Sequence, residues 1–332
     1  MYEGDRIVTV TTLRETASQI ERFVERTLRS GVDHMIVFLD AHPPRAAAVL
    51  KSNPAVSVVR TDAEYWSGGR PDAVMDRQMT NANVACTALA DVQAVRWLFH
   101  IDGDEALAFD RDDLLALDAR SVRFATLEAV ARRRWLSNQP QWFKRQPSDG
   151  ELHALVALGY IKTPEMRSFY RGHSLGRPGV KPAERVRFRT HTAFELPDRD
   201  IPTVVPHNMH LLHYESWCLN DFIERWKGAR RRPLEDKRVG AAFHLYFHSR
   251  NHSEGERRRL VAGLYDQYIA DDPEPLRKFD LLVRSPVRKT DPRPLSQTEV
   301  ARIDDALLAL HTVDKSEFRS TLEGAELNAR AT

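Results

Sequence analysis

The chain has 332 residues, enough for one large domain or for one domain with an appendage. Its 49 lysines and arginines nearly balance 47 acidic residues, and the net charge of +2 argues against a general nucleic-acid binder. The two cysteines form neither a disulfide framework nor a metal-binding spacing, which indicates a reducing compartment. The sequence has no signal-peptide pattern and no apolar run of roughly 18 residues, so we expect a cytoplasmic protein.

Strands and helices alternate over the first hundred residues. The β-branched run Ile7 to Thr12 predicts a strand, and Thr16 with Gln19 forms a capping box before apolar residues at helical spacing. Further strands are expected at 35–39, 55–60 and 97–101, with helices at 46–51 and 72–91 between them. This alternation predicts an α/β fold with a mostly parallel, Rossmann-like sheet flanked by helices.

The most informative segment follows the second of these helices. Apolar side chains alternate through Trp97 to Ile101, as in a strand buried on both faces, and three carboxylates follow within four positions. Two of them, Asp102 and Asp104, would repel each other unless a cation such as Mg²⁺ lay between them. Gly103 permits a turn at this strand end. The segment predicts a metal site, and the alternative is a solvated acidic turn.

The predicted strands bring several polar residues to one edge of the sheet. In a parallel sheet Thr12, Asp40, Asp62 and Asp102 all lie at the carboxyl ends, where ligands bind. No glycine-rich phosphate loop follows the first strand. The phosphates of a bound nucleotide would therefore have to be neutralised in another way, and a metal on Asp102 and Asp104 would do that.

The order of elements and the segment Trp97 to Glu105 resemble the GT-A glycosyltransferases. The closest likeness is to the family-two-like bacterial branch, in which Glu follows the Asp-x-Asp motif. The resemblance covers roughly residues 5–230. It is also carried by Arg77-Gln78, Asn81, His213-Tyr214, Ser216 and the helix at Asp221-Phe222.

The resemblance implies an inverting, hexosyltransferase-like enzyme of polysaccharide biosynthesis that uses Mn²⁺ or Mg²⁺. It would move a sugar from a nucleotide-sugar donor, UDP- or GDP-linked, to a glycan or lipid-linked acceptor. The donor-binding residues implied are Thr12, Glu15, Asp40, Asp62, Arg77, Asn81 and Asp102. Two departures affect the nucleotide end: Arg14-Glu15 replaces the common Asn-Glu, and Asp40 begins Asp-Ala-His-Pro-Pro in place of Asp-x-Ser-x-Asp.

Three histidines follow further along, at 207, 210 and 213. Their spacing fits neither one face of a strand nor a zinc motif. In many GT-A enzymes a downstream histidine completes the metal sphere, and the resemblance assigns that role to His213 beside Asp102 and Asp104. The alternative for His213 is a satisfied core residue.

An inverting transfer also needs a carboxylate base near the acceptor. Among Glu165, Glu184, Glu195 and Asp200 we choose Glu165, because it precedes a strand predicted from Phe169 to Leu175, where family bases tend to fall; Asp102 is the other catalytic candidate. A second strand is predicted from Arg185 to Phe194, with His191 in its middle. The aromatic residues Trp135, Trp142 and Phe143 could stack on a sugar acceptor or pack in a core.

Beyond the predicted GT-A domain, residues 1–218, the sequence predicts a helical C-terminal region at 219–332. Asn220 is placed to cap a helix over 221–230, and further helices are expected over 254–270 and from a capping box at Ser296 and Glu299 to 310. Arginine triplets at 230–232 and 257–259 are either solvated faces or basic patches, which would steer a phosphate-bearing donor or contact anionic lipid at the inner face of a membrane.

Two other functions remain open. Metal-dependent phosphohydrolases and nucleotidyltransferases also use paired aspartates, although a phosphohydrolase would normally carry a nucleophilic aspartate after strand one, where Thr11-Thr12-Leu13 has none. A non-catalytic sugar-binding module would not need Asp102 and Asp104 together.

Overall fold

The computed structural model describes residues 4–41, 44–67, 69–137, 139–197, 199–228, 251–286 and 292–319. The chain divides into two compact units. The first comprises Met1–Ala125, Leu175–Leu211 and Val287–Thr332, and the second comprises Thr126–Ser174 and Leu212–Pro286. The division into 1–218 and 219–332 stays a prediction.

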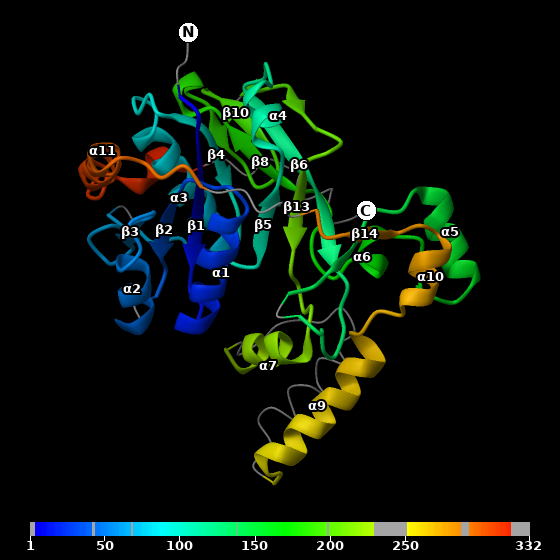
Figure 1. Cartoon of the computed structure of the whole chain (residues 1–332). Coiled ribbons are helices and arrows are strands. Elements are labelled where there is room, and N and C mark those ends of the chain that lie inside the picture. Colours follow the sequence, from blue (N-terminus) through cyan, green and yellow to red (C-terminus); the bar gives the residue numbers. More distant parts are fainter. Residues whose placement is uncertain are drawn as a thin grey trace. The chain divides into compact units, whose positions relative to one another are not determined.

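The first unit is built on a largely parallel sheet (Figure 1). Its strands β1 (Arg6–Leu13), β2 (His34–Leu39), β3 (Val56–Arg60) and β4 (Val95–His100) are parallel in the order β3-β2-β1-β4. Beyond β4, β8 (Arg177–Val180) runs antiparallel to it, and the start of β6 (Ser121–Ala129) pairs with β8. This arrangement confirms the predicted α/β class with a mostly parallel, Rossmann-like sheet.

Helices cover both faces of this sheet because its strands are apolar on both faces. Ile7, Trp97 and Phe99 point to the face covered by α1 (Ala17–Arg29) and α2 (Pro44–Lys51). Val8 and Leu98 point to the other face, covered by α3 (Val74–Ala88) and α11 (Gln297–Ala309). The capping boxes predicted at Thr16 and Ser296 are both present.

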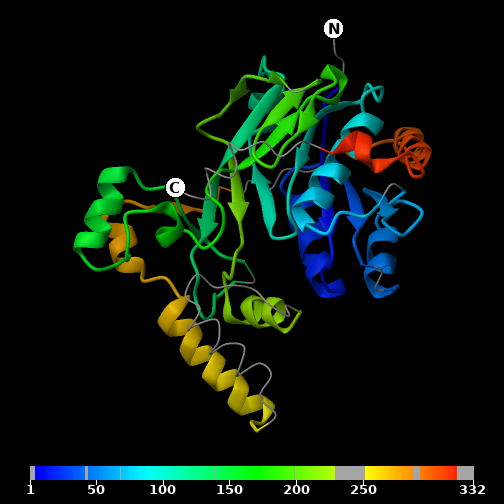
Figure 2. The ribbon, with the colours of Figure 1, turned by 180° about the vertical axis from the view of Figure 1, so that it is seen from behind.

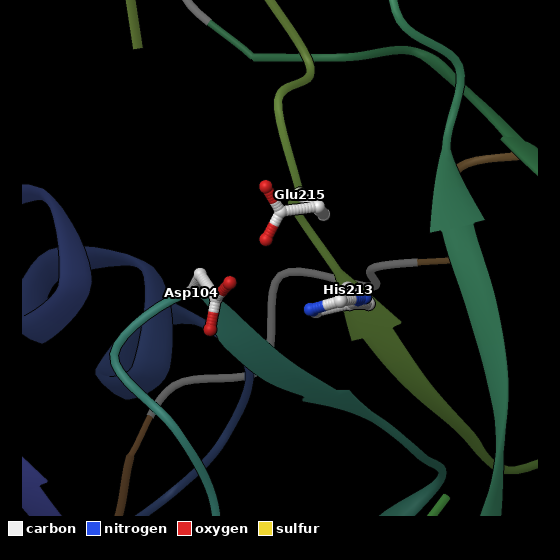
Figure 3. A group of neighbouring side chains, drawn as sticks. All are labelled: Asp104, His213 and Glu215. Atoms are coloured by element: carbon white, nitrogen blue, oxygen red, sulfur yellow. The ribbon is translucent and has the colours of Figure 1, made fainter. Parts of the chain in front are cut away.

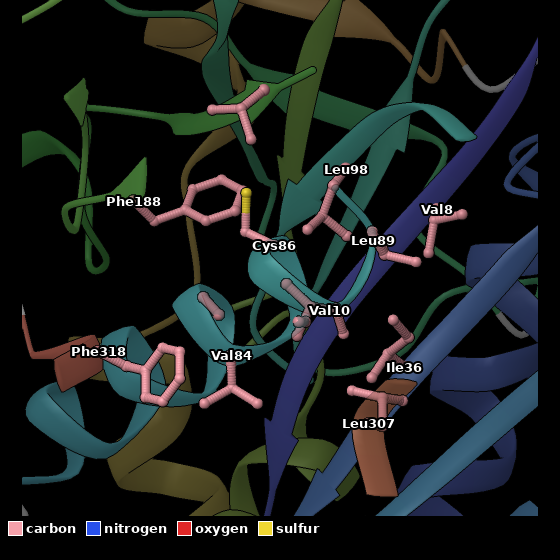
Figure 4. Packing of buried hydrophobic residues seen from close by; sticks show 14 of the residues in the cluster. Val8, Val10, Ile36, Val84, Cys86, Leu89, Leu98, Phe188, Leu307 and Phe318 are labelled. Atoms are coloured by element: carbon pink, nitrogen blue, oxygen red, sulfur yellow. The ribbon is translucent and has the colours of Figure 1, made fainter. Parts of the chain in front are cut away.

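The last described residues of the chain belong to the core of the first unit. Leu307 of α11 and Phe318 of the 3-10 helix η2 (Lys315–Phe318) are buried in the same cluster as Val84 and Cys86 of α3 (Figure 4). Figure 2 shows α11 beside α3 from behind. A helical segment near the end of the sequence therefore covers one face of a sheet that begins at residue 6.

Short elements complete the first unit. They are β5 (Glu105–Ala108), α4 (Arg111–Leu115), η1 (Pro182–Glu184), β9 (Arg187–Phe188), β10 (Ala193–Glu195), β11 (Arg199–Asp200) and β12 (Thr203–Val204). The strand predicted over 185–194 is wrong as a single strand, because β9 and β10 pair antiparallel around a turn that contains His191.

The second unit combines a small antiparallel sheet with helices. The end of β6 pairs with β7 (Trp142–Lys144), which pairs with β14 (Leu282–Arg284). The helices are α5 (Asp149–Ala157), α6 (Met166–Phe169), α7 (Leu219–Gly228), α9 (Glu254–Tyr268) and α10 (Pro273–Lys278). Strand β13 (His210–His213) crosses from the first unit to the second.

Two sequence predictions in the second unit are corrected. The strand expected from Phe169 to Leu175 is absent, since α6 ends at Phe169 and irregular backbone follows. Helix α7 already begins at Leu219, so Asn220 lies within its first turn and is not its cap. The arginine triplet 230–232 lies outside the described residues. Among the residues that are described, no helix is long and apolar enough to span a membrane.

Candidate functional site

The acidic segment after β4 forms a tight turn. The backbone N–H of Asp102 donates to the Glu105 carboxylate at 2.7 Å, and the Glu105 N–H donates to the Asp102 carbonyl at 3.0 Å. A Cβ on Gly103 would lie 2.9 Å from Leu13 Cδ2 and 3.3 Å from the Glu15 carboxylate. A larger residue here would have to push the Leu13 side chain aside, so glycine suits the close approach of this turn to the end of β1.

A buried arginine holds two of the three carboxylates in this turn. Arg177 Nε donates to both carboxylate oxygens of the fully buried Glu105 at 3.1 Å, and its Nη2 pairs with the Asp102 carboxylate. Gln78 Nε2 of α3 donates to Asp102 Oδ1 at 2.7 Å. Burial alone would lower the pKa of Arg177, but the charges of Asp102 and Glu105 raise it, so the guanidinium stays a cation.

Asp104 belongs to a different group of side chains. Figure 3 shows Asp104, from the turn before β5, with His213, from the end of β13, and Glu215, two residues further on. Each offers one ligand atom, and together the three could hold a divalent metal ion. Two carboxylates and an imidazole form a donor set that suits Mn²⁺. Asp102 is not a member of this group.

The second unit fixes the carboxylate of Glu215. Ser216 Oγ donates to one of its oxygens at 2.8 Å, and Arg225 Nη1 of α7 pairs with the other at 3.1 Å. Arg225 also pairs with Asp221 on the same helix at 3.0 Å. Glu215 is thus held with an orientation that does not depend on a metal.

Three predicted donor-binding residues, Thr12, Asn81 and Arg77, hold the sheet edge and α3 together. Tyr65 Oη donates to Asn81 Oδ1 at 2.6 Å, and Asn81 Nδ2 donates to Thr12 Oγ1 at 2.9 Å. Asp40, at the end of β2, pairs with Arg77 at 3.0 Å and with Arg70 at 2.8 Å. These contacts link Thr12 and Asp40, which lie at the predicted sheet edge, to Asn81 and Arg77 of α3.

The remaining predicted donor-binding residues are also located at strand ends. Asp62, after β3, accepts the Tyr65 N–H at 3.1 Å and lies 3.6 Å from His311 Nε2. Glu15, after β1, accepts the Arg14 N–H at 2.6 Å. Thr12 lies near the end of β1, and Asp40, Asp62 and Asp102 follow β2, β3 and β4, so the four residues share one edge of the parallel strands, as expected. Their contact with a donor stays a prediction.

Glu165, the predicted base, lies in the second unit directly before α6. Arg167 pairs with its carboxylate, and Thr163 Oγ1 donates to it at 3.4 Å. The hydrogen bond from Arg167 lowers the pKa of Glu165. A lowered pKa weakens a general base, and the catalytic role of Glu165 stays a prediction.

Sequence reasoning missed Arg177 and Glu215 for different reasons. Arg177 reaches Asp102 only because β8 pairs with β4, and no sequence pattern near either strand predicts that pairing. Glu215 follows His213 by two residues. An acidic side chain so close in sequence to a candidate metal ligand could have indicated a further ligand.

Comparisons with known proteins give little support beyond these observations. No family model and no curated protein matches the chain. A mannose-1-phosphate geranyltransferase from Thermus thermophilus has 12% identity and a TM-score of 0.27, over 54% of this chain and 58% of that one. HddC from Yersinia pseudotuberculosis has 10% identity and a TM-score of 0.32, over 67% and 96%. The chain thus spans little more than half of the first protein, and similarities this weak carry no argument about function.

Proposed function

We propose that the protein is a metal-dependent glycosyltransferase that takes its sugar from a UDP- or GDP-linked donor. The observation that carries this proposal is the group Asp104, His213 and Glu215, whose aspartate lies at the carboxyl edge of a parallel sheet. The resemblance of the Trp97 to Glu105 segment to GT-A enzymes supports it. No glycine-rich loop follows β1 to neutralise a diphosphate, so a cation at this edge has a clear purpose.

In this proposal the two aspartates of the motif have separate tasks. Asp104 holds the metal with His213 and Glu215, and bound Mn²⁺ or Mg²⁺ supplies Lewis-acid stabilisation of the diphosphate leaving group. Asp102, oriented by Arg177 and Gln78, accepts hydrogen bonds from donor hydroxyls. The strand-end residues Thr12, Glu15, Asp40 and Asp62, with Arg77 and Asn81 of α3, line the nucleotide side.

The acceptor side of the proposal rests on two tryptophans and Glu165. Trp135 and Trp142 are partly exposed and suit stacking on a glycan or the glycan part of a lipid-linked acceptor. Phe143 is fully buried 5.5 Å from the Tyr214 ring, which makes it a core residue. Glu165 would accept the proton of the acceptor hydroxyl. A cytoplasmic location, with contact between Arg257–259 and the inner membrane face, belongs to the same proposal.

Product analysis tests this function against its alternatives. Purified protein is incubated with UDP- and GDP-sugars and Mn²⁺ or Mg²⁺, and separately with a nucleoside triphosphate and a sugar 1-phosphate. Metal-dependent release of nucleoside diphosphate, lost in Asp104→Asn, supports glycosyl transfer. Pyrophosphate release in the second reaction would instead identify a nucleotidyltransferase, and sugar binding without turnover would identify a binding module.

A further inference from the structure

The His213 ring packs directly against the backbone of Gly172, with no room for a side chain at position 172. The His213 side chain is 6% exposed at the end of β13. A Cβ built on Gly172 would lie 1.8 Å from His213 Cε1 and 2.3 Å from its Nδ1. Atoms cannot approach so closely, and any residue other than glycine at 172 would therefore displace the imidazole.

The backbone at Gly172 is fastened to a buried carboxylate. Glu128, near the end of β6, is fully buried, and its Oε2 accepts the N–H groups of Arg171 and Gly172, each at 2.8 Å. The same Oε2 lies 3.9 Å from His213 Nδ1. Glu128 therefore fixes the segment that presses on the ring, and its charge faces the ring's Nδ1 side.

The buried charge of Glu128 is balanced within the second unit. Lys144 Nζ lies 2.8 Å from Glu128 Oε1 and 3.2 Å from Asp271, and Arg171 pairs with Asp271 at 2.7 Å. Burial would raise the pKa of Asp271, but Arg171 and Lys144 lower it to about 2. Two acids and two bases thus form a neutral, preformed framework behind the histidine.

We propose that Gly172 and Glu128 are positioning residues that orient His213 as a metal ligand. They occupy the Cε1–Nδ1 edge of the imidazole, which leaves Nε2 as the nitrogen presented to a metal. A carboxylate behind a ligating histidine fixes ring orientation and raises ligand basicity, and losing such support weakens metal binding roughly 10–100-fold. This inference rests on the metal role of His213 in the proposed function.

Pulsed electron paramagnetic resonance of bound Mn²⁺ provides a test that needs no enzyme activity. A coordinated imidazole adds a nitrogen modulation to the Mn²⁺ signal, and titration with Mn²⁺ alone gives the affinity. Wild-type protein should show the modulation. Gly172→Ala should lose it and bind Mn²⁺ about 10–100-fold more weakly. Gly150→Ala, on α5 of the same unit, is the matched control, because a Cβ there meets nothing within 4 Å.

Glu128→Gln keeps the size of the side chain and tests the same idea if Gly172→Ala fails to fold. It should weaken Mn²⁺ binding and the nitrogen modulation, with its circular dichroism spectrum unchanged. Wild-type affinity and modulation in either folded variant would overturn the positioning role while leaving the proposed function intact. A wild-type protein without nitrogen modulation would overturn both, whereas modulation without any response to nucleotide sugars would remove only the proposed function.

Discussion

At the scale of single residues, neighbouring carboxylates have different surroundings. Asp102 and Glu105 share the buried guanidinium of Arg177, whereas Asp104, between them in sequence, groups with His213 and Glu215. Spacing alone predicted one metal site for both aspartates, because two carboxylates so close together need a cation. Arg177, 75 residues further along the chain, places a protein cation beside Asp102, and the metal role of Asp102 stays a prediction.

Removing that cation should destabilise the fold. Arg177→Met leaves Glu105 buried without its partner, and breaking such a pair costs about 3–5 kcal/mol. Denaturant unfolding measures the free energy directly. Arg29→Met is the matched control, since Arg29 and Glu25 form an exposed pair on α1 and its loss should change stability by less than about 0.5 kcal/mol. Equal stability of the two variants would contradict the role given to Arg177.

At the scale of elements, the sequence predicted correctly those strands and helix starts that depend on residues close together in the chain. The alternating apolar residues of β1, β2 and β4 and the capping boxes at Thr16 and Ser296 all encode structure within a few residues. The segment from Phe169 to Leu175 was predicted wrongly because its path is set from a distance, by the hydrogen bonds from Arg171 and Gly172 to Glu128. The candidate site divides in the same way. Asp104 and His213 could be proposed from the Asp-x-Asp motif and from position in the sequence. The contact between Arg177 and Asp102 could not, because it depends on the pairing of β8 with β4.

The pairing of β2 with β3 contains a pH-sensitive contact. His34 Nε2 and Ser57 Oγ are hydrogen-bonded at 2.8 Å, and burial lowers the pKa of His34 from 6.5 to about 4. Between these values the unfolded chain binds more protons than the folded one, so stability falls as the pH drops from 6.5 towards 4. The loss from this group should reach about 3 kcal/mol.

His34→Gln should reduce this pH dependence, because glutamine can donate to Ser57 without titrating. Denaturant unfolding at several pH values from 4 to 7.5 measures the slope for each protein. His153→Gln, at an exposed position on α5, should retain the wild-type slope. A slope for His34→Gln that matches wild type would show that His34 does not carry the effect.

At the scale of the whole molecule, sequence order and structural units do not coincide. Each unit is assembled from separated segments, and α11 packs in the core of the unit that contains β1. The sequence predicted the helix itself, but capping and periodicity carry no information about which sheet a helix covers. Apolar contacts between residues more than 200 positions apart decide that.

Two adjacent leucines test this placement of α11. Leu307 is 4% exposed and Leu308 is 70% exposed. Leu307→Ala should destabilise the protein by about 2–5 kcal/mol through the cavity it leaves, whereas Leu308→Ala should change stability by less than about 0.5 kcal/mol. Chemical denaturation of both variants gives the comparison. Similar small losses in both would mean that α11 is not part of the core.

In the proposed function, a metal held by Asp104 binds the diphosphate of a nucleotide donor. Calorimetric titration of UDP and GDP, in Mn²⁺ and in chelator, into wild-type protein and Asp104→Asn tests it most directly. We expect one of the two nucleotides to bind tightly, and only when Mn²⁺ and wild-type protein are both present. The melting temperature of Asp104→Asn should be nearly that of wild type. Equal nucleotide affinity in Mn²⁺ and in chelator would contradict it.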